Sequence, residues 1–144
     1  NVRQLHYSLG YVEFAYALQN DLSWAQMQNR TGKFVTPSED SFAAAAQHAQ
    51  WSDTPGMGVI LTDMPGEDSW PITAASFILV HKKQKNAAQG QATLEFFDWA
   101  FSEGADMARE LDYVPLPEAV IAQIRTAWST DIRDTDGQPI WPAR

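Results

Sequence analysis

Hydrophobic and small side chains follow one another most continuously in residues 72–81, which read ITAASFILVH. Residues 77–80, FILV, are uninterrupted, and this is typical of a strand that is buried on both faces. Lys82 and Lys83 then return the chain to solvent. The pattern therefore predicts a buried strand that ends near residue 81.

A second pattern, with apolar residues three and four positions apart, begins after residue 36 and predicts an amphipathic helix to about residue 48. Thr36 can cap this helix, Pro37 suits its first position, and Glu39 can reach back to the N–H of Thr36. The residues that share its apolar face are Phe42, Ala45, Ala46 and Ala49.

Two further helices follow from the same periodicity. One covers about residues 94–104, with Gly104 near its C-cap and a short helix over 106–111 behind it. The other is opened by Pro117. Their apolar stripes are Leu94, Phe97, Ala100 and Phe101 in the first, and Val120, Ile121, Ile124, Ala127 and Trp128 in the last.

The remaining segments predict short elements. Residues 11–18 suggest a strand that runs into a helical turn, residues 24–28 a turn of helix, and residues 34–35 and 59–61 brief strands, the latter buried. Pro and Gly place a turn at residues 65–68. Because strands alternate with amphipathic helices, the fold class is α/β, in layers.

Charge changes which partners are expected. Ten Lys and Arg stand against eighteen Asp and Glu, a formal charge of −8 that disfavours nucleic acid and anionic membranes. A phosphate binder with this charge would depend on a local set of hydrogen-bond donors. There is no cysteine, so disulfides and thiolate metal sites are excluded. No apolar run reaches the ~18 to 20 residues of a membrane span, and the first residues lack the apolar core of a signal peptide.

Carboxylates gather in two places. Asp63, Glu67 and Asp68 could serve acid–base chemistry or a cation, but Pro and Gly between them favour a solvated turn. Asp134 and Asp136 resemble the start of a calcium loop, yet the sequence lacks the other ligands of that motif, so we expect a turn.

Other catalytic or metal-binding patterns are weak. His6, His48 and His81 have no paired spacing, no G-x-S-x-G elbow is present, and we expect no catalytic residue, metal or cofactor. Trp99 and Trp128 lie close to apolar stripes, which favours packing in the core or between lobes over ligand stacking.

Four motifs taken together point to a family. They are GYVEFAYALQN at residues 10–20, GEDSWPITAASFILVHK at 66–82, LEFFDWA at 94–100 and LDY at 111–113. In register from about residue 10 to 139, the chain resembles the C-terminal part of the PstS family, the periplasmic phosphate-binding proteins of bacterial phosphate ABC importers. One departure is HYSL at residues 6–9, where the family usually has a small Pro-Gly-Ser-Ile type segment.

The resemblance implies a partial type II periplasmic binding protein fold. Residues 1–70 would complete the second lobe, Pro71, Ile72 and Thr73 would lie at the hinge, and residues 71–144 would form the crossing segment and the end of the first lobe. The resemblance also implies that the phosphate-binding residues lie in a missing N-terminal part, because in the family those segments precede the part matched here. The sequence itself has no Gly/Ser/Thr-rich loop that opens a helix.

The same resemblance implies a function and partners. The complete protein would capture inorganic phosphate in the periplasm by hinge closure and deliver it to an ABC permease, without enzymatic chemistry. The isolated chain should expose apolar surface and unpaired strand edges, which invite the missing N-terminal half or a second copy of the chain. Two alternatives are a phosphatase-like extracytoplasmic enzyme and an interaction or adhesion module on the same scaffold.

Overall fold

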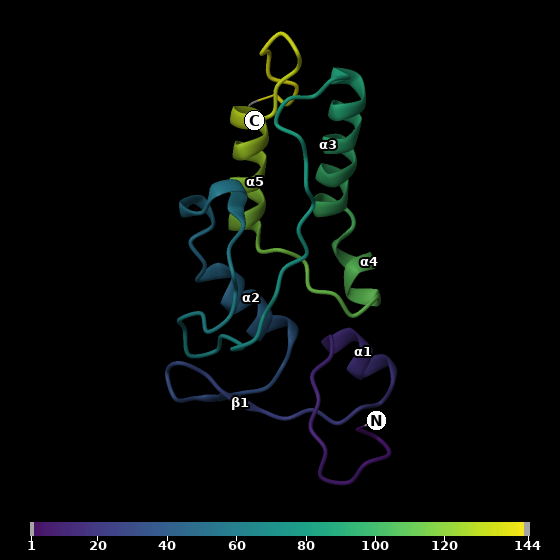
Figure 1. Cartoon of the computed structure of the whole chain (residues 1–144), viewed down its shortest axis with the longest axis vertical. Coiled ribbons are helices and arrows are strands. Elements are labelled where there is room, and N and C mark those ends of the chain that lie inside the picture. Colours follow the sequence, from purple (N-terminus) through teal and green to yellow (C-terminus); the bar gives the residue numbers. More distant parts are fainter. Residues whose placement is uncertain (1, 143–144) are drawn as a thin grey trace.

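A computed structural model describes residues 2–142, which form an elongated arrangement of helices joined by long irregular segments (Figure 1). The described residues contain one small sheet, in which β1 and β2 pair antiparallel. The elements in chain order are α1 (Phe14–Gln19), β1 (Met27–Gln28), β2 (Phe34–Val35), α2 (Glu39–Gln47), the 3-10 turns Trp51–Asp53 and Pro55–Met57, α3 (Ala87–Ser102), α4 (Ala105–Glu110) and α5 (Glu118–Asp131).

The mixture of helices and a sheet agrees with an α/β fold, but several predicted strands are not formed. Residues 11–13, 59–61 and 72–81 are extended or irregular, and Thr62 and Ile72 meet only in an isolated antiparallel bridge. Residues 24–28 were expected to be helical, and instead contribute β1, which pairs with the predicted strand at 34–35. A strand requires a partner backbone, and within residues 2–142 these extended segments have none apart from the single bridge at Ile72.

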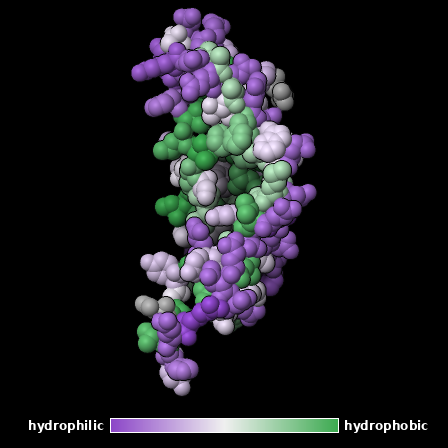
Figure 2. Space-filling model, turned by 90° about the vertical axis from the view of Figure 1, so that its right-hand side faces the viewer, coloured by the Kyte–Doolittle hydropathy of each residue, from purple (hydrophilic) through white to green (hydrophobic). Residues whose placement is uncertain are grey.

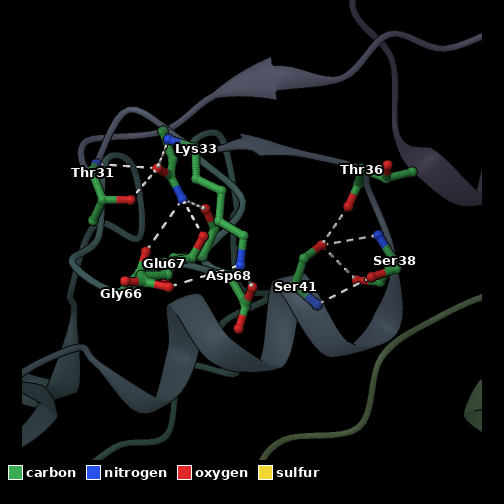
Figure 3. A network of polar contacts seen from close by, with 10 residues as sticks. Thr31, Lys33, Thr36, Ser38, Ser41, Gly66, Glu67 and Asp68 are labelled. Carbon is green, nitrogen blue, oxygen red and sulfur yellow. Dashed lines mark hydrogen bonds and ion pairs between the residues drawn. The ribbon is translucent and has the colours of Figure 1, made fainter.

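Helix α2 begins two residues later than the sequence suggests. Its N-cap is Ser38, whose hydroxyl accepts a hydrogen bond from the Ser41 N–H, while the Ser41 hydroxyl accepts one from the Ser38 N–H (Figure 3). Ser38 therefore replaces Thr36 as the cap, and Ser41 replaces Glu39 in the capping box. The predicted end of the helix is confirmed, with His48 as C-cap.

Two buried clusters form the core, and α5 contributes to both. Its N-terminal half places Val120 against a cluster with Trp51 and Leu61, and its C-terminal half places Trp128 against a cluster with Leu94. The stripe predicted for the last helix is thus confirmed, because Val120, Ile121 and Trp128 are buried. The first cluster comprises Ala46, Ala49, Trp51, Leu61 and Val120, and the second Leu94, Trp128, Ile132, Ile140 and Trp141.

A polar contact fixes α3 beside α5. Arg125 donates to Asp98 at 2.7 Å, to Ser102 at 3.0 Å and to Glu118 at 3.2 Å. The side chains of Arg125 and Asp98 are mostly buried, so this ion pair is less screened than a surface pair. The two helices therefore meet through both an apolar cluster and a charged one.

The junction of α3 and α4 explains Gly104. Glu103 is the C-cap of α3 and Gly104 the N-cap of α4, so Gly104 lies next to the C-cap, as predicted. A Cβ added to Gly104 would lie 2.6 Å from the carbonyl oxygen of Ala100. Only glycine lets the chain turn this closely against the end of α3.

Candidate functional site

The residues predicted as a hinge lie together at a firmly anchored point. The N–H of Asp63 donates to the carbonyl of Pro71 at 2.8 Å, next to the bridge that Ile72 makes. Thr73 is buried, and its hydroxyl donates to the carbonyl of Trp70 at 3.1 Å. The N–H of Trp70 donates in turn to the backbone carbonyl of Ser41 in α2, at 3.0 Å. The chain thus leaves the α2 region through a short, hydrogen-bonded turn.

Beyond this anchor, residues 74–80 form an extended segment that rises along the long axis between α5 and α3 (Figure 1). No hydrogen bond joins the backbone of these seven residues to any other part of residues 2–142. The prediction of a strand buried on both faces is wrong for this structure, since Phe77, Ile78 and Leu79 are exposed, Leu79 by 95%. The cause is the lack of a neighbouring strand among the described residues.

The segment is nevertheless held in place by side chains that contact both core clusters. Ala75 packs against the cluster that contains Trp51 and Val120, and Val80 packs against the cluster around Leu94. The ring of Phe77 lies 6.5 Å from that of Trp51, centroid to centroid. The segment therefore contacts both core clusters near its ends, while Ile78 and Leu79 are exposed and its backbone edges have no partner within residues 2–142.

The far end of the segment is anchored against the residues after α5. The N–H of Arg133 donates to the carbonyl of Lys82 at 2.8 Å, and the N–H of Gln84 to that of Arg133 at 2.7 Å. The ammonium of Lys82 donates to Asp131 at 2.6 Å. Both ends of residues 74–80 are therefore fixed.

The contact between Lys82 and Asp131 leads to a prediction about pH. The hydrogen bond from Lys82, followed by that from Thr130, holds the pKa of Asp131 below its ordinary value of 3.8. A lowered pKa means that the folded state favours the charged carboxylate, so this stabilisation is present above about pH 4 and is lost as pH falls through the folded-state pKa. Solvent screens the pair, because both side chains are substantially exposed.

We expect an NMR titration of the Asp131 carboxyl to give a midpoint below 3.8, and the Lys82→Met variant to raise that midpoint. Lys83→Met, at the next residue, is the matched control and should leave it unchanged. A midpoint in the Lys82→Met variant equal to that of the unmodified chain would show that the contact does not persist in solution.

A second polar centre joins the β1–β2 hairpin to the turn at residues 65–69 (Figure 3). Its hub is Asn29, which is buried. The side-chain amide nitrogen donates to the carbonyls of Gly66, Glu67 and Ser69 at 3.2, 2.8 and 3.3 Å. The side-chain oxygen accepts from the N–H and hydroxyl of Thr31 and from the N–H of Lys33, at 3.1, 2.8 and 3.2 Å.

Gly66 lets this turn approach α2. Its φ is +109°, and an added Cβ would lie 2.6 Å from His48 and 2.8 Å from the Ser69 hydroxyl. Ser69 is fully buried and donates to the carbonyl of Pro65 at 2.6 Å. The turn predicted from Pro and Gly is confirmed, and its backbone bonds are met by Asn29 and Ser69.

The carboxylates of this turn are solvated and paired with cations. Asp63 lies 3.3 Å from Arg30, and Lys33 lies 2.6 Å from Asp68 and 4.0 Å from Glu67. The hydrogen bond and charge of Asp68, with a smaller contribution from Glu67, raise the pKa of Lys33. The side chains of Asp63, Glu67 and Asp68 are at least 60% exposed, so the structure supports the solvated turn rather than an acid–base cluster.

Metal ligands do not converge in the part of the chain that the structure describes. Among residues 2–142, no group of three or more His, Asp or Glu side chains could hold an ion. The turn predicted at Asp134 is confirmed, because its carboxylate accepts from the N–H groups of Asp136 and Gln138 at 2.9 and 2.8 Å. The ring of His48 bonds to the carbonyl of Ala44 at 2.7 Å, at the end of α2.

The guanidinium groups of four internal arginines already have partners. Arg30 pairs with Asp63, Arg109 with Glu39 and Asp106, and Arg125 with Asp98 and Glu118, while Arg133 donates to the carbonyl of Thr130. Two of the four reach helix N-termini, where Arg109 pairs with Glu39 of α2 and Arg125 with Glu118 of α5, so carboxylates of the chain already neutralise these cations. The arrangement of these groups therefore offers no convergent donor set for an oxyanion.

Apolar side chains gather on one long face, around a hollow in its middle part (Figure 2). Helix α3 is apolar on two sides, with Leu94 buried and Phe96 and Trp99 exposed. Trp128 is buried as expected for a core residue, whereas Trp99 is 46% exposed. The exposed large apolar residues after residue 73 are Phe77, Ile78, Leu79, Phe96, Trp99, Met107, Leu111 and Tyr113.

In the described part of the chain, no helix is both long and apolar enough to cross a bilayer.

Sequence comparison with known proteins identifies relatives of this chain. No protein-family model matches the chain. It is 54% identical over 140 residues, 97% of its length, to "Phosphate-binding protein PstS" of Pasteurella multocida. Proteins of the same name from Haemophilus influenzae and Xylella fastidiosa are 57% and 48% identical, each over 92% of the chain.

The chain is much shorter than these relatives. It spans 41%, 40% and 36% of the Pasteurella, Haemophilus and Xylella proteins, respectively. Its similarity to them nevertheless extends over nearly the whole chain, because the matches cover more than nine tenths of its residues. The chain spans about two fifths of the length of these relatives, and it belongs to the PstS family.

Proposed function

We propose that the chain is the C-terminal portion of a two-lobed periplasmic solute-binding protein, which captures inorganic phosphate and delivers it to an ABC importer. The observation that carries this proposal is the 48–57% identity to relatives named for phosphate binding. In this account the complete protein binds and releases phosphate without forming or breaking a covalent bond.

The proposed arrangement follows the type II binding-protein topology. Residues 1–70 complete the second lobe, residues 71–73 lie at the hinge, and the chain from residue 74 returns to the first lobe. The anchored turn supports this placement, since Pro71 and Thr73 are held by Asp63 and Trp70 while the next residues extend away unpaired. A hinge needs such a fixed point, at which a few residues absorb the change in backbone angles.

We place the phosphate-binding groups in the part of the parent protein outside these residues. Phosphate recognition needs several donors that converge, such as helix N-termini, hydroxyls and an arginine fork. Here the guanidinium groups of Arg30, Arg109 and Arg125 are engaged with carboxylates. The chain then supplies framework and hinge, and the remaining polypeptide supplies affinity and specificity.

The two alternative functions have less support. The relatives are named as binding proteins, which does not favour a phosphatase-like enzyme. An adhesion module would draw on exposed aromatic residues such as Trp24 and Trp99. Those rings are equally explained as surface that the rest of a two-lobed protein covers.

A chimera tests the proposal. In the Pasteurella multocida relative, the matched segment is replaced by this chain, and phosphate and sulfate are titrated by calorimetry. We expect one phosphate site with a Kd of about 1 μM or tighter and no measurable heat with sulfate, because sulfate at neutral pH lacks the proton with which hydrogen phosphate can donate a hydrogen bond. A chimera that unfolds cooperatively but binds no phosphate, when the unaltered relative does bind it, would disprove the assignment.

A further inference from the structure

We propose that the ion pair of Arg109 with Glu39 is a polar clasp between the two lobes of the parent protein, which closes when phosphate is taken up and opens when it is released. The inference deepens the proposed function and rests on it, because residues 1–70 and the chain from residue 74 are assigned there to different lobes. Arg109 and Glu39 would then influence phosphate affinity although the anion is bound elsewhere.

The clasp joins α4 to the start of α2, above α1 (Figure 1). The guanidinium of Arg109, in α4, donates to the carboxylate of Glu39, in the first turn of α2, at 2.9 Å. Close by in the chain, the Gln19 amide at the end of α1 donates to Asp112, just after α4, at 3.3 Å. Both hydrogen bonds are exposed to solvent, and both connect residues before the proposed hinge with residues after it.

A different contact between the same two parts of the chain is apolar and buried. Val120, near the start of α5, lies in one cluster with Ala46, Trp51 and Leu61. Separating these side chains would expose apolar surface to water, which is unfavourable in proportion to the area exposed. The lobes are therefore expected to turn about this contact rather than to part along it.

Helix α2 connects this pivot to the clasp. Glu39 lies in its first turn, whereas Ala46 lies near its other end, in the apolar cluster. The seven residues between these positions span about 10 Å of helix. A rotation about the apolar contact therefore displaces Glu39 from Arg109 more than it displaces the side chains of the cluster. Because the clasp needs the lobes close together, it stabilises the closed form that holds phosphate.

Opening the clasp leaves neither charge without a favourable neighbour. Arg109 also donates to Asp106 of its own helix, at 2.8 Å. Glu39 remains in the first turn of α2, where the helix dipole favours a negative charge. The hydrogen bond and charge of Glu39, with a smaller contribution from Asp106, raise the pKa of Arg109, so Glu39 is the stronger partner while the clasp is closed. Such a contact can break and reform at low cost, as a reversible clasp requires.

Phosphate titrations of the chimera with the Pasteurella relative test the clasp. Arg109→Met and Glu39→Gln each remove the ion pair, and each should raise the Kd for phosphate by about two- to fivefold, as expected for an exposed pair. The two variants change the net charge in opposite senses. A general effect of charge on the binding of an anion would therefore move the two Kd values in opposite directions, whereas loss of the clasp moves both upward.

The double variant with both substitutions completes the cycle. It should raise the Kd no further than the stronger single variant does, because each substitution removes the same contact. Melting temperatures measured without phosphate should agree within about 2 °C among these proteins, since exposed substitutions cost little stability. A loss of affinity at unchanged melting temperature assigns the effect to closure rather than to folding.

Charge reversal gives a larger effect and has a matched control. Arg109→Glu places two carboxylates opposite each other across the clasp, and it should raise the Kd by about tenfold at low salt. Lys33→Glu makes the same change of charge at a pair with Asp68 that lies wholly within residues 1–70. It should leave the Kd within about twofold of the unaltered chimera, because no contact between the lobes is lost.

Four outcomes would overturn the clasp: unchanged affinity in both single variants, tighter binding in either of them, a double variant whose loss is the product of the two single losses, or an equal loss in Lys33→Glu and Arg109→Glu. Failure of the proposed function is recognised separately. An unaltered chimera that unfolds cooperatively but binds no phosphate would refute phosphate capture and the clasp that rests on it. A chimera that binds phosphate equally well with and without Arg109 and Glu39 would refute the clasp alone.

Discussion

Leu94→Ala should destabilise the isolated chain by about 3 kcal/mol, within the range of ~2–5 kcal/mol for leucines truncated in a core. Leu94 is fully buried, and its side chain lies in the cluster with Trp128, Ile140 and Trp141. Truncation removes apolar contacts and leaves a cavity between α3 and α5. The measurement is the free energy of unfolding in urea, followed by tryptophan fluorescence.

The same substitution at an exposed leucine is the matched control. Leu79 is 95% exposed in this structure, so Leu79→Ala should change the stability of the isolated chain by less than about 0.5 kcal/mol. In the chimera, where neighbouring strands are expected to cover residue 79, its cost should rise towards that of Leu94→Ala. Equal costs for the two variants in the isolated chain would contradict the packing described here.

Asn29→Ala should also cost about 3 kcal/mol, since one buried side chain meets the hydrogen-bonding needs of two loops. The amide donates to three carbonyls of residues 66–69 and accepts from Thr31 and Lys33. Without it, buried carbonyl and N–H groups are left unpaired, and each costs roughly 1–3 kcal/mol unless water reaches it. Urea unfolding of the isolated chain is again the measurement.

Gln28→Ala, in the same hairpin, provides the comparison. Gln28 is exposed and donates one side-chain hydrogen bond, to the carbonyl of Gly32 at 2.9 Å. Its removal should cost less than about 1 kcal/mol, because water replaces the lost partner. If Asn29→Ala proves as mild as Gln28→Ala, Asn29 does not organise the two loops as described.

Elements stabilised by local contacts were predictable from the sequence. The stripe of Val120, Ile121 and Trp128 marks α5, and the Pro-Gly pair at 65–66 marks its turn, because helical periodicity and turn chemistry act within a few residues. The start of α2 was misplaced by two residues, since Thr36 and Ser38 are both acceptable caps. The choice of Ser38 depends on Ser41, whose hydroxyl also donates to the carbonyls of Thr36 and Ser38.

The strand at residues 72–81 shows why other elements could not be predicted for the chain as given. Its apolar run is correctly typical of a buried strand, but burial and pairing depend on polypeptide that lies elsewhere. A local pattern specifies which surface a segment needs, and cannot state whether that surface is present. The exposed Phe77, Ile78 and Leu79 follow from that difference.

The polar centre at Asn29 was missed as a structural feature. Asn29-Arg30-Thr31 reads as a glycosylation triplet, whereas the amide nitrogen that would carry a sugar is buried and bonded to carbonyls. A usable signal was the asparagine three residues before Gly32, because Asn side chains often bond the backbone of a turn that follows them. Its partners at residues 66–69 are 37 or more residues away, and no local pattern indicates them.

Calorimetric titration of the isolated chain with inorganic phosphate tests the central claim most directly. The account predicts no saturable binding below about 1 mM, because the groups that hold the anion lie in the rest of the parent protein. Circular dichroism on the same sample should show helix, in keeping with α2, α3 and α5. Saturable one-site binding at micromolar or lower concentration would show that this chain holds phosphate by its own groups, and would contradict the claim.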